Sequence, residues 1–281
     1  DSRVNIRGLE RGSLILVNGV PMNLNGKGGL SSIPTDSIAR IEILKGAASA
    51  LYGSDAMSGV VNVITKTPNK EGGSATVAVG NRGSHSYRVN YGTPRFLIGV
   101  ERGFFGEQDP STPVRTDSVV RPRGYEYYTA REKGNSLGLF MSGKVSDKVT
   151  FNFSRFEGKS AYAQVSTESN VTNRNRHSTT YAYDDTKNNA SLIFKDDNTT
   201  ATLFYNDRDL KGKNRKHNLS SYTSNDSNYI ARQYGFDVQH EWDFRGGKDY
   251  LIAGVLGKRE TYRTTSGPVY ASPHRHSLAL Y

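Results

Sequence analysis

The sequence predicts a mainly β protein, in which a transmembrane antiparallel β-barrel wall of about ten strands follows a small α+β segment. After Gly73, apolar and polar residues alternate, as in strands whose two faces meet different surroundings. Short turns alternate with long polar connections. Aliphatic stretches are as short as Leu14 to Val17, whereas a membrane-spanning helix needs about 20 apolar residues. A soluble β-sandwich is the alternative fold class.

The composition excludes several kinds of site. The chain has 281 residues and no cysteine, which excludes disulfides, cysteine-ligated metal sites and a thiol nucleophile. Lysine and arginine number 37 against 27 acidic residues, a net charge of +10. Only 35% of the residues are apolar. That value fits a soluble protein and equally a membrane barrel, because barrel strands face lipid at every second residue only.

Glycines interrupt the first 70 residues. Short aliphatic runs such as Leu14 to Val17 and Ile41 to Leu44 lie between them, a pattern typical of short strands and tight turns. The best helix candidate is residues 34–38, where Thr35 or Asp36 is positioned to cap one short turn. A strand over residues 40–44 is expected to follow that turn.

Beyond residue 73 the strand pattern is regular. Leu137, Leu139 and Met141 fall on one face of an expected strand, and the small polar residues between them fall on the other. Phe140 alone breaks this alternation, because it is apolar at a polar position. The expected strands begin near residues 74, 85, 95, 135, 148, 188, 199, 228, 248 and 274.

The connections between these strands alternate in length. The tight turns are Thr93-Pro94, Ser146-Asp147, Asp196 to Asn198 and Arg245 to Gly247. The long polar segments lie at about residues 106–134, 159–187, 209–227 and 264–273. Outer-membrane barrels have short periplasmic turns and long extracellular loops, so this pattern favours the membrane barrel over the soluble sandwich.

Four motifs follow one another in the first 70 residues. They read VNIRG at 4–8, LILVNGVP at 14–21, IPTDSIARIEILKG at 33–46 and ALYGSDAMSGVVNVITK at 50–66. In content, order and spacing this series resembles the plug domain of TonB-dependent outer-membrane receptors, with the colicin and catecholate-siderophore receptors as the suggested branch. Residues 279–281, ALY, are a weaker match to a barrel strand of the same family.

The resemblance implies a plug domain over residues 1–70 and the N-terminal part of a transmembrane β-barrel over residues 71–281. Barrels that hold such a plug have about 22 strands. The ten strands expected here are therefore part of a longer receptor, or half of a barrel that a second chain completes. The plug is expected to be incomplete at its N-terminus, with its TonB-binding box outside this sequence.

The resemblance also implies a function without catalysis. It implies active import of a scarce nutrient complex through the outer membrane of a Gram-negative bacterium, driven by TonB with ExbB and ExbD in the periplasm. No catalytic triad spacing, phosphate-binding loop or HExxH metal motif is present in the sequence, in agreement with a protein that is not an enzyme. No covalently bound cofactor and no resident metal are expected.

Two arginines match plug positions that pair with barrel-wall glutamates in this family. They are Arg7 in the first motif and Arg40 in the third. The resemblance implies that they form a plug–barrel latch of charge-assisted hydrogen bonds, which break and form again during transport.

The transported ligand is expected to be a ferric siderophore. Asn23, Asn25 and Lys27 lie in a glycine-containing loop that would form the plug apex, and Arg121 and Arg123 form a basic cluster in a long loop, suited to an anionic ligand. Haem is a weaker alternative, to which His274 and His276 would be the candidate ligands, and cobalamin is another. A flexible apex without a ligand role also fits the glycine loop.

The net positive charge raises the alternative of a protein that binds nucleic acid. A basic nucleic-acid-binding β protein would gather its cations on one face with stacking aromatics. Here the positive charge is spread through the whole chain, so no nucleic-acid partner is expected. A passive porin is opposed by the plug motifs. Lipopolysaccharide, and colicins or phages that dock on the receptor, are expected partners at the cell surface.

Overall fold

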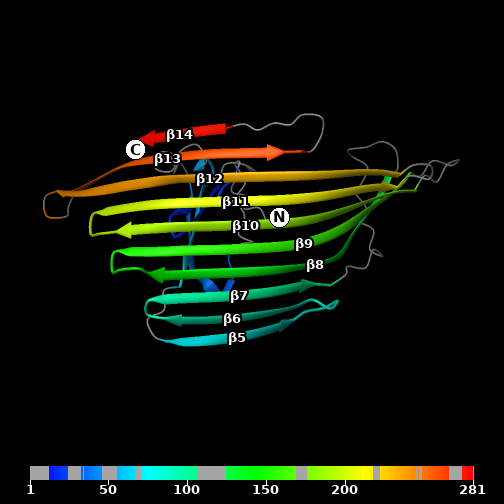
Figure 1. Ribbon diagram of the computed structural model, residues 1–281, viewed down its shortest axis with the longest axis horizontal. Helices are drawn as coiled ribbons and strands as arrows, with labels where there is room; N and C mark the ends of the chain where they lie inside the picture. The colour runs from blue at the N-terminus through cyan, green and yellow to red at the C-terminus, as the bar shows by residue number, and fades with distance from the viewer. Residues whose placement is uncertain are drawn as a thin grey trace.

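The computed structural model describes residues 13–24, 33, 35–45, 56–66, 71–106, 125–168, 176–217, 222–244, 246, 249–265 and 274–280. They form a four-stranded sheet and a ten-stranded sheet (Figure 1). Among these residues no helix has the length and apolar character needed to cross a membrane. The predicted fold class, antiparallel barrel strands with a small segment before them, is confirmed.

The smaller sheet, here called the plug sheet, contains β1 (Ser13–Val17), β2 (Val20–Pro21), β3 (Ile38–Lys45) and β4 (Gly59–Thr65) in the order β2-β1-β4-β3. Strands β1 and β4 are parallel, and the other pairs are antiparallel. A 3-10 turn, η1 (Thr35–Ser37), leads into β3, as the sequence predicts. Every residue of β1 is buried, because its two faces pack in two apolar clusters, one around Ile15 and one around Leu16.

A two-residue turn joins β1 to β2. Asn18 and Gly19 both have positive φ angles, of 51° and 82°, which is the type I′ turn that suits a two-residue hairpin. The Asn18 carboxamide accepts a hydrogen bond from the backbone N–H of Thr65 at 3.0 Å. The turn is thereby tied to the end of β4, and its position within the plug sheet is fixed.

The larger sheet, here called the wall, is a meander in which each strand pairs with the next one along the chain. Its strands lie side by side in Figure 1, and β8 to β12 run much further to the right than β5 to β7. Within the described residues β5 and β14 are the two edges. The strands are β5 (Gly72–Val79), β6 (His85–Thr93), β7 (Phe96–Phe105), β8 (Tyr125–Lys144), β9 (Val149–Glu168), β10 (Arg176–Lys195), β11 (Thr199–His217), β12 (Tyr222–Phe244), β13 (Asp249–Thr264) and β14 (His274–Leu280).

The two faces of the wall differ in chemistry. On the outer face, large apolar side chains such as Leu203 and Phe236 are exposed. On the opposite, plug-facing face, the alternate residues Thr202, Phe204 and Asn206 are buried. The alternation of apolar and polar residues in the sequence therefore reflects the different surroundings of the two faces of each strand.

The wall strands are longer than their alternating pattern predicts. All ten predicted strands are present, as are the tight turns at residues 93–94, 146–147 and 196–198, but β8 begins at Tyr125 rather than near residue 135, and β10 at Arg176 rather than near residue 188. Apolar and polar residues do not alternate in the sequence of these extensions, so the pattern does not mark them as strands. Their backbones are nevertheless paired through the cross-strand ladder, which requires no apolar face.

Two isoleucines of the plug sheet provide a matched test of its core. Ile15 is 1% exposed and Ile43 is 56% exposed. We expect Ile15→Ala to destabilise the plug by about 2–5 kcal/mol, because it removes buried methylene groups and leaves a cavity. Ile43→Ala should cost much less. Urea-dependent protease susceptibility of the plug measures both variants, and equal effects would contradict this core assignment.

Candidate functional site

The plug sheet contacts the wall through a row of polar side chains. Five cross-strand partners share the plug-facing face of adjacent strands, and we call them the polar row: Ser154 on β9, Asn189 on β10, Asn206 on β11, Gln233 on β12 and Glu260 on β13. Directly opposed residues lie on one face of a sheet. The row therefore crosses five strands at one height, next to the β1–β2 hairpin of the plug.

Two members of the polar row donate hydrogen bonds to the plug backbone. Asn206 Nδ2 donates to the carbonyl oxygen of Pro21 at 2.7 Å, and Gln233 Nε2 donates to that of Asn23 at 3.2 Å. Both side chains are 0% exposed. A buried carbonyl without a donor costs about 1–3 kcal/mol, so these contacts satisfy acceptors that would otherwise destabilise the docked plug.

Asn206 and Gln233 each use their second amide hydrogen to bind the next residue of the polar row. Asn206 Nδ2 also donates to Gln233 Oε1 at 2.9 Å, and Gln233 Nε2 donates to Glu260 Oε1 at 2.8 Å. The Glu260 carboxylate lies 3.9 Å from Lys258 Nζ and 3.8 Å from Arg275 Nη1. An ionised carboxylate only accepts hydrogen bonds. Glu260 therefore fixes the orientation in which the Gln233 amide presents its N–H to Asn23.

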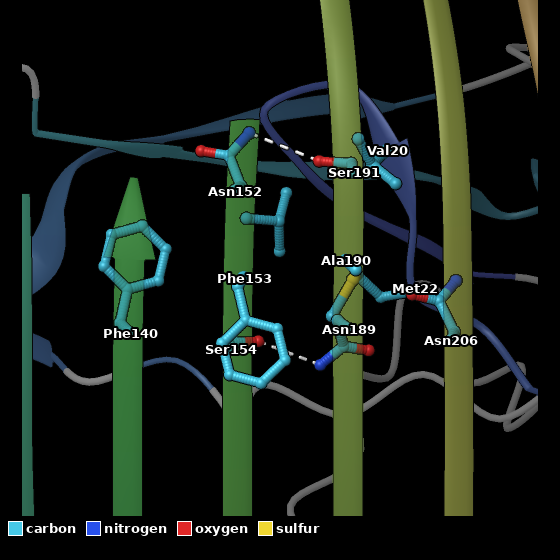
Figure 2. Close-up of a pocket in the computed structure, with 11 residues that line it drawn as sticks. Val20, Met22, Phe140, Asn152, Phe153, Ser154, Asn189, Ala190, Ser191 and Asn206 are labelled. Atoms are coloured by element: carbon cyan, nitrogen blue, oxygen red, sulfur yellow. Dashed lines mark hydrogen bonds between the residues drawn. The ribbon is translucent and has the colours of Figure 1, made fainter. Parts of the chain in front are cut away.

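A second contact lies at the tip of the hairpin. Asn18 Nδ2 donates to Asn152 Oδ1 of β9 at 3.3 Å, and Asn152 Nδ2 donates to Ser191 Oγ of β10 at 3.2 Å. Figure 2 shows the Asn152–Ser191 bond and, below it, the bond from Asn189 to Ser154. The turn that fixes the hairpin within the plug sheet thus also contacts the wall.

A small cavity separates the two contacts. Its volume is about 20 Å³, and its lining combines apolar plug residues, among them Val20 and Met22, with Phe140 and amides of the wall (Figure 2). A cavity of this size has room for about one water molecule. Within the described residues, buried Asn206 Oδ1 has no hydrogen-bond partner. The plug thus meets the wall through a few neutral hydrogen bonds around an incompletely filled gap.

Charged residues lie immediately beyond the polar row on the same face of the wall. Arg208 donates to both oxygens of Asp185, at 2.8 and 2.9 Å, and Lys187 Nζ lies 3.3 Å from the same carboxylate. The Lys187 ammonium also lies 5.3 Å from the centre of the Phe156 ring. These side chains connect β9, β10 and β11 to one another next to the plug contact.

The structure gives Asn23 a role within the plug. Its Oδ1 accepts from the Ile15 N–H and its Nδ2 donates to the Ser13 carbonyl, both at 2.9 Å, while its own carbonyl receives Gln233. The side chain thus secures the hairpin that carries the wall contact.

Arg40 lies on β3, where its guanidinium donates to Glu42 of the same strand at 2.8 Å. Both side chains are well exposed, at 64% and 40%, and exposed pairs contribute about 0–1 kcal/mol. Arg7, Asn25, Lys27, Arg121 and Arg123 lie outside the described residues.

The sequence alone does not identify Asn206 and Gln233 as residues that contact the plug. Each is a polar residue at a polar position of a strand, and only the register between strands shows that both meet the plug. One signal for this surface was present, since Phe140 breaks the alternation of its strand. The structure buries that ring against the plug at 2% exposure. No group of three or more metal-binding side chains occurs in the described part of the chain.

Comparison with known proteins supports the motif analysis. Residues 1–60 match the family model of the TonB-dependent receptor plug domain. A curated relative, the vitamin B12 transporter BtuB of Vibrio vulnificus, is 43% identical over 84 residues, which are 29% of this chain and 14% of the relative.

Solved structures match most of the chain at low identity. The ferric yersiniabactin uptake receptor FyuA from Yersinia pestis has a TM-score of 0.49 and 14% identity, over 96% of this chain and 52% of that one. The siderophore receptor PirA from Acinetobacter baumannii has a TM-score of 0.48 and 16% identity, over 90% and 40%. The chain thus spans about half or less of these proteins.

The matched family is one of receptors, not of enzymes. The resemblance carried by the four motifs is confirmed by the family model over residues 1–60. The segment that packs on the polar face of the wall therefore resembles a plug domain, and the match to TonB-dependent receptors covers residues 1–60 of the chain.

Proposed function

We propose that this chain forms the plug, over residues 1–70, and the first part of the barrel wall, over residues 71–281, of an outer-membrane receptor that actively imports a scarce nutrient complex. The observation that carries the proposal is the arrangement of the two parts. A segment of the plug family lies on the polar face of a ten-stranded antiparallel sheet, and buried amides of that sheet bind its backbone.

The outer face of the wall supports a place in the membrane. Along β11, the outward residues Ala201, Leu203 and Tyr205 are followed by Asp207 and Asp209. From Thr199 to Asp207 the strand extends about 27 Å along its own axis, which is a height of about 20 Å at the tilt of about 35–45° of membrane barrel strands. Membrane barrels have an outward apolar band about 25 Å tall. The band on this face is therefore comparable in height with the hydrocarbon layer of a bacterial outer membrane.

A row of polar side chains marks the upper limit of that band. Arg155, Asn188, Asp207 and Arg232 are cross-strand partners on the outer face of β9 to β12. Arg155 donates to Asn188 at 2.9 Å, and Asn188 donates to Asp207 at 3.3 Å. Arginines at this height are placed to meet the phosphates of lipopolysaccharide, which is the membrane partner that we propose.

The plug–wall contact suits a plug that is moved during transport. Each neutral hydrogen bond contributes about 0.5–1.5 kcal/mol, because water replaces the partner when the bond breaks. The polar row therefore holds the plug at rest without a large barrier to its displacement. TonB, with ExbB and ExbD, would pull on the plug from the periplasm. The remainder of the wall, from the same or a second chain, would pair with the edges of β5 and β14.

For the cargo we propose a ferric siderophore as the transported ligand, with no covalent cofactor. Asn25 and Lys27 of the plug, together with Arg121 and Arg123, are the ligand contacts that we propose. Asn23, the fifth residue of the predicted set, is buried with its amide bound to the plug backbone. Cobalamin is the second candidate, because the 43% identical relative is a vitamin B12 transporter. Haem is disfavoured, since His276 pairs with Arg259, opposite Tyr234, on the outer face away from the plug.

The polar row predicts a specific loosening of the plug. Gln233→Ala removes the amide that donates hydrogen bonds to the Asn23 carbonyl and to Glu260. We expect the loss to reduce the free energy of plug docking by about 1–3 kcal/mol. Faster hydrogen exchange or proteolysis of the β1–β2 hairpin in the purified receptor measures the effect.

Gln239→Ala is the matched control for that variant. Gln239 lies on the same face of β12, and its amide donates to Asp237 at 3.3 Å within the wall. Equal protection of the hairpin in both variants and in the unmodified receptor would refute a role of Gln233 in docking.

The proposed latch predicts a second effect on the plug. Removing one partner of a buried charged pair costs about 3–5 kcal/mol, so Arg7→Ala should make the plug markedly more sensitive to protease. Arg95→Ala, in the exposed turn between β6 and β7, serves as the control. Unchanged protease resistance of the Arg7 variant would count against the latch.

Growth under nutrient limitation tests the function itself. A receptor-deletion strain that carries the complete reading frame should grow on a ferric siderophore as its iron source, and should fail to grow when TonB is also deleted. Rescue by cyanocobalamin in a cobalamin-dependent strain would select the second candidate. Growth that does not depend on TonB would refute active import.

A further inference from the structure

A pocket lies further along the plug-facing face, beyond the polar row and the charged residues. On β10 it is lined by Tyr181 and Tyr183, on β11 by Gly212 and Asn214, and on β12 by Asn225 and Ser227. Tyr183, Gly212 and Ser227 are cross-strand partners, as are Tyr181, Asn214 and Asn225. Gly212 and Asn214 have the same parity as Asn206, so the six residues share the face that meets the plug.

The position of the pocket separates it from the plug contact. Gly212 lies six residues after Asn206 along β11, which is a distance of about 20 Å along the strand. The pocket thus lies on the long-loop side of the polar row. Its volume is about 360 Å³, within the range of about 300–1,000 Å³ of small-molecule sites.

A glycine opens the floor of the pocket. A Cβ added at Gly212 would lie 2.6 Å from Ser227 Oγ and 3.4 Å from the Tyr183 ring. The absence of a side chain therefore lets the tyrosine ring lie close to the backbone of β11. The pocket thereby gains an aromatic surface next to hydroxyl and amide groups.

The residues of the pocket that face the plug side are all uncharged. They provide two phenols, two carboxamides and one hydroxyl. Asn214 Oδ1 is buried and, among the described residues, has no hydrogen-bond partner. An aromatic surface surrounded by such donors and acceptors favours a ring that offers an apolar face and several hydroxyl groups at its edge.

The two charged residues that line the pocket belong to the other face of the sheet. Lys213 and Asp226 complete the lining but alternate with the residues above, so their side chains have the opposite parity. Arg215 Nη1 donates to Asp226 Oδ1 at 2.6 Å. This hydrogen bond holds the pKa of the Asp226 carboxyl below its usual range. At neutral pH Asp226 is thus an ionised partner of Arg215 rather than a separate acceptor for a ligand.

We propose that this pocket binds an uncharged saccharide ring, which stacks on Tyr181 or Tyr183 and receives hydrogen bonds from Asn214, Asn225 and Ser227. The binding itself requires only the geometry of β10 to β12. That the sugar is part of the imported cargo rests on the proposed function. This assignment differs from the anionic cargo expected at the basic loops, because the pocket offers no unpaired positive charge to an anion on its plug-facing side among the described residues.

Titration of the purified full-length receptor with defined probes tests the proposal. Maltotriose serves as the neutral saccharide and 2,3-dihydroxybenzoate as the anionic aromatic probe, with binding followed by saturation-transfer NMR and calorimetry. We expect maltotriose to bind and to lose at least tenfold in affinity in Tyr183→Ala and Asn214→Ala. Tyr205→Ala, which removes a tyrosine from the outer face of β11, is the matched control and should leave binding unchanged.

Other outcomes overturn the assignment. Absence of maltotriose binding, or equal affinity in all three variants, would refute a saccharide site here. Stronger binding of 2,3-dihydroxybenzoate that is lost in Tyr183→Ala would assign the pocket to an anionic aromatic ligand instead. The thermal unfolding midpoint of each variant separates loss of the site from loss of the fold. Because the titration needs no TonB, its result is independent of the growth assay that tests import.

Discussion

The docking of the plug depends on how two buried carboxamides use their hydrogens. Asn206 and Gln233 each give one N–H to a plug carbonyl and the other to a neighbour in the wall. Neither amide has an N–H to spare, and Glu260 sets the orientation of Gln233. Because both plug groups that receive these bonds are backbone carbonyls, Asn206 and Gln233 recognise the shape of the hairpin rather than a plug side chain.

This contact is possible because the wall has two chemically different faces. The same period of two that exposes Leu203 and Phe236 on the outer face buries Asn206 and Gln233 on the other. A shift of the strand register by one residue would exchange these faces, and it would remove both the apolar band and the plug contact. Membrane placement and plug docking are therefore two consequences of one register.

Much of the fold could be predicted because its signals are local. The Asn18-Gly19 pair specifies the I′ turn, and tight turns at Pro94 and Gly246 separate strands that alternate clearly. The polar extensions of β8 to β12 were not predictable, since an alternating apolar pattern exists only where one face is apolar. The polar row was missed for a different reason. It is a property of register between distant strands, and Gln233 meets the carbonyl of Asn23 across 210 positions of sequence. Phe140 shows that an apolar residue at a polar position of a strand can indicate a surface that contacts the plug.

A cross-link between plug and wall tests the arrangement most directly. The chain has no cysteine, so an introduced pair reacts without background. Val20 of the plug and Ser191 of the wall line the same cavity, whereas Tyr205 lies on the outer face. In the full-length receptor, Val20→Cys with Ser191→Cys should join through a short bismaleimide, keep cargo binding and lose uptake, and Val20→Cys with Tyr205→Cys should not join. Failure of the first pair to cross-link, or unchanged uptake after it has done so, would contradict a plug held on this face and moved during transport.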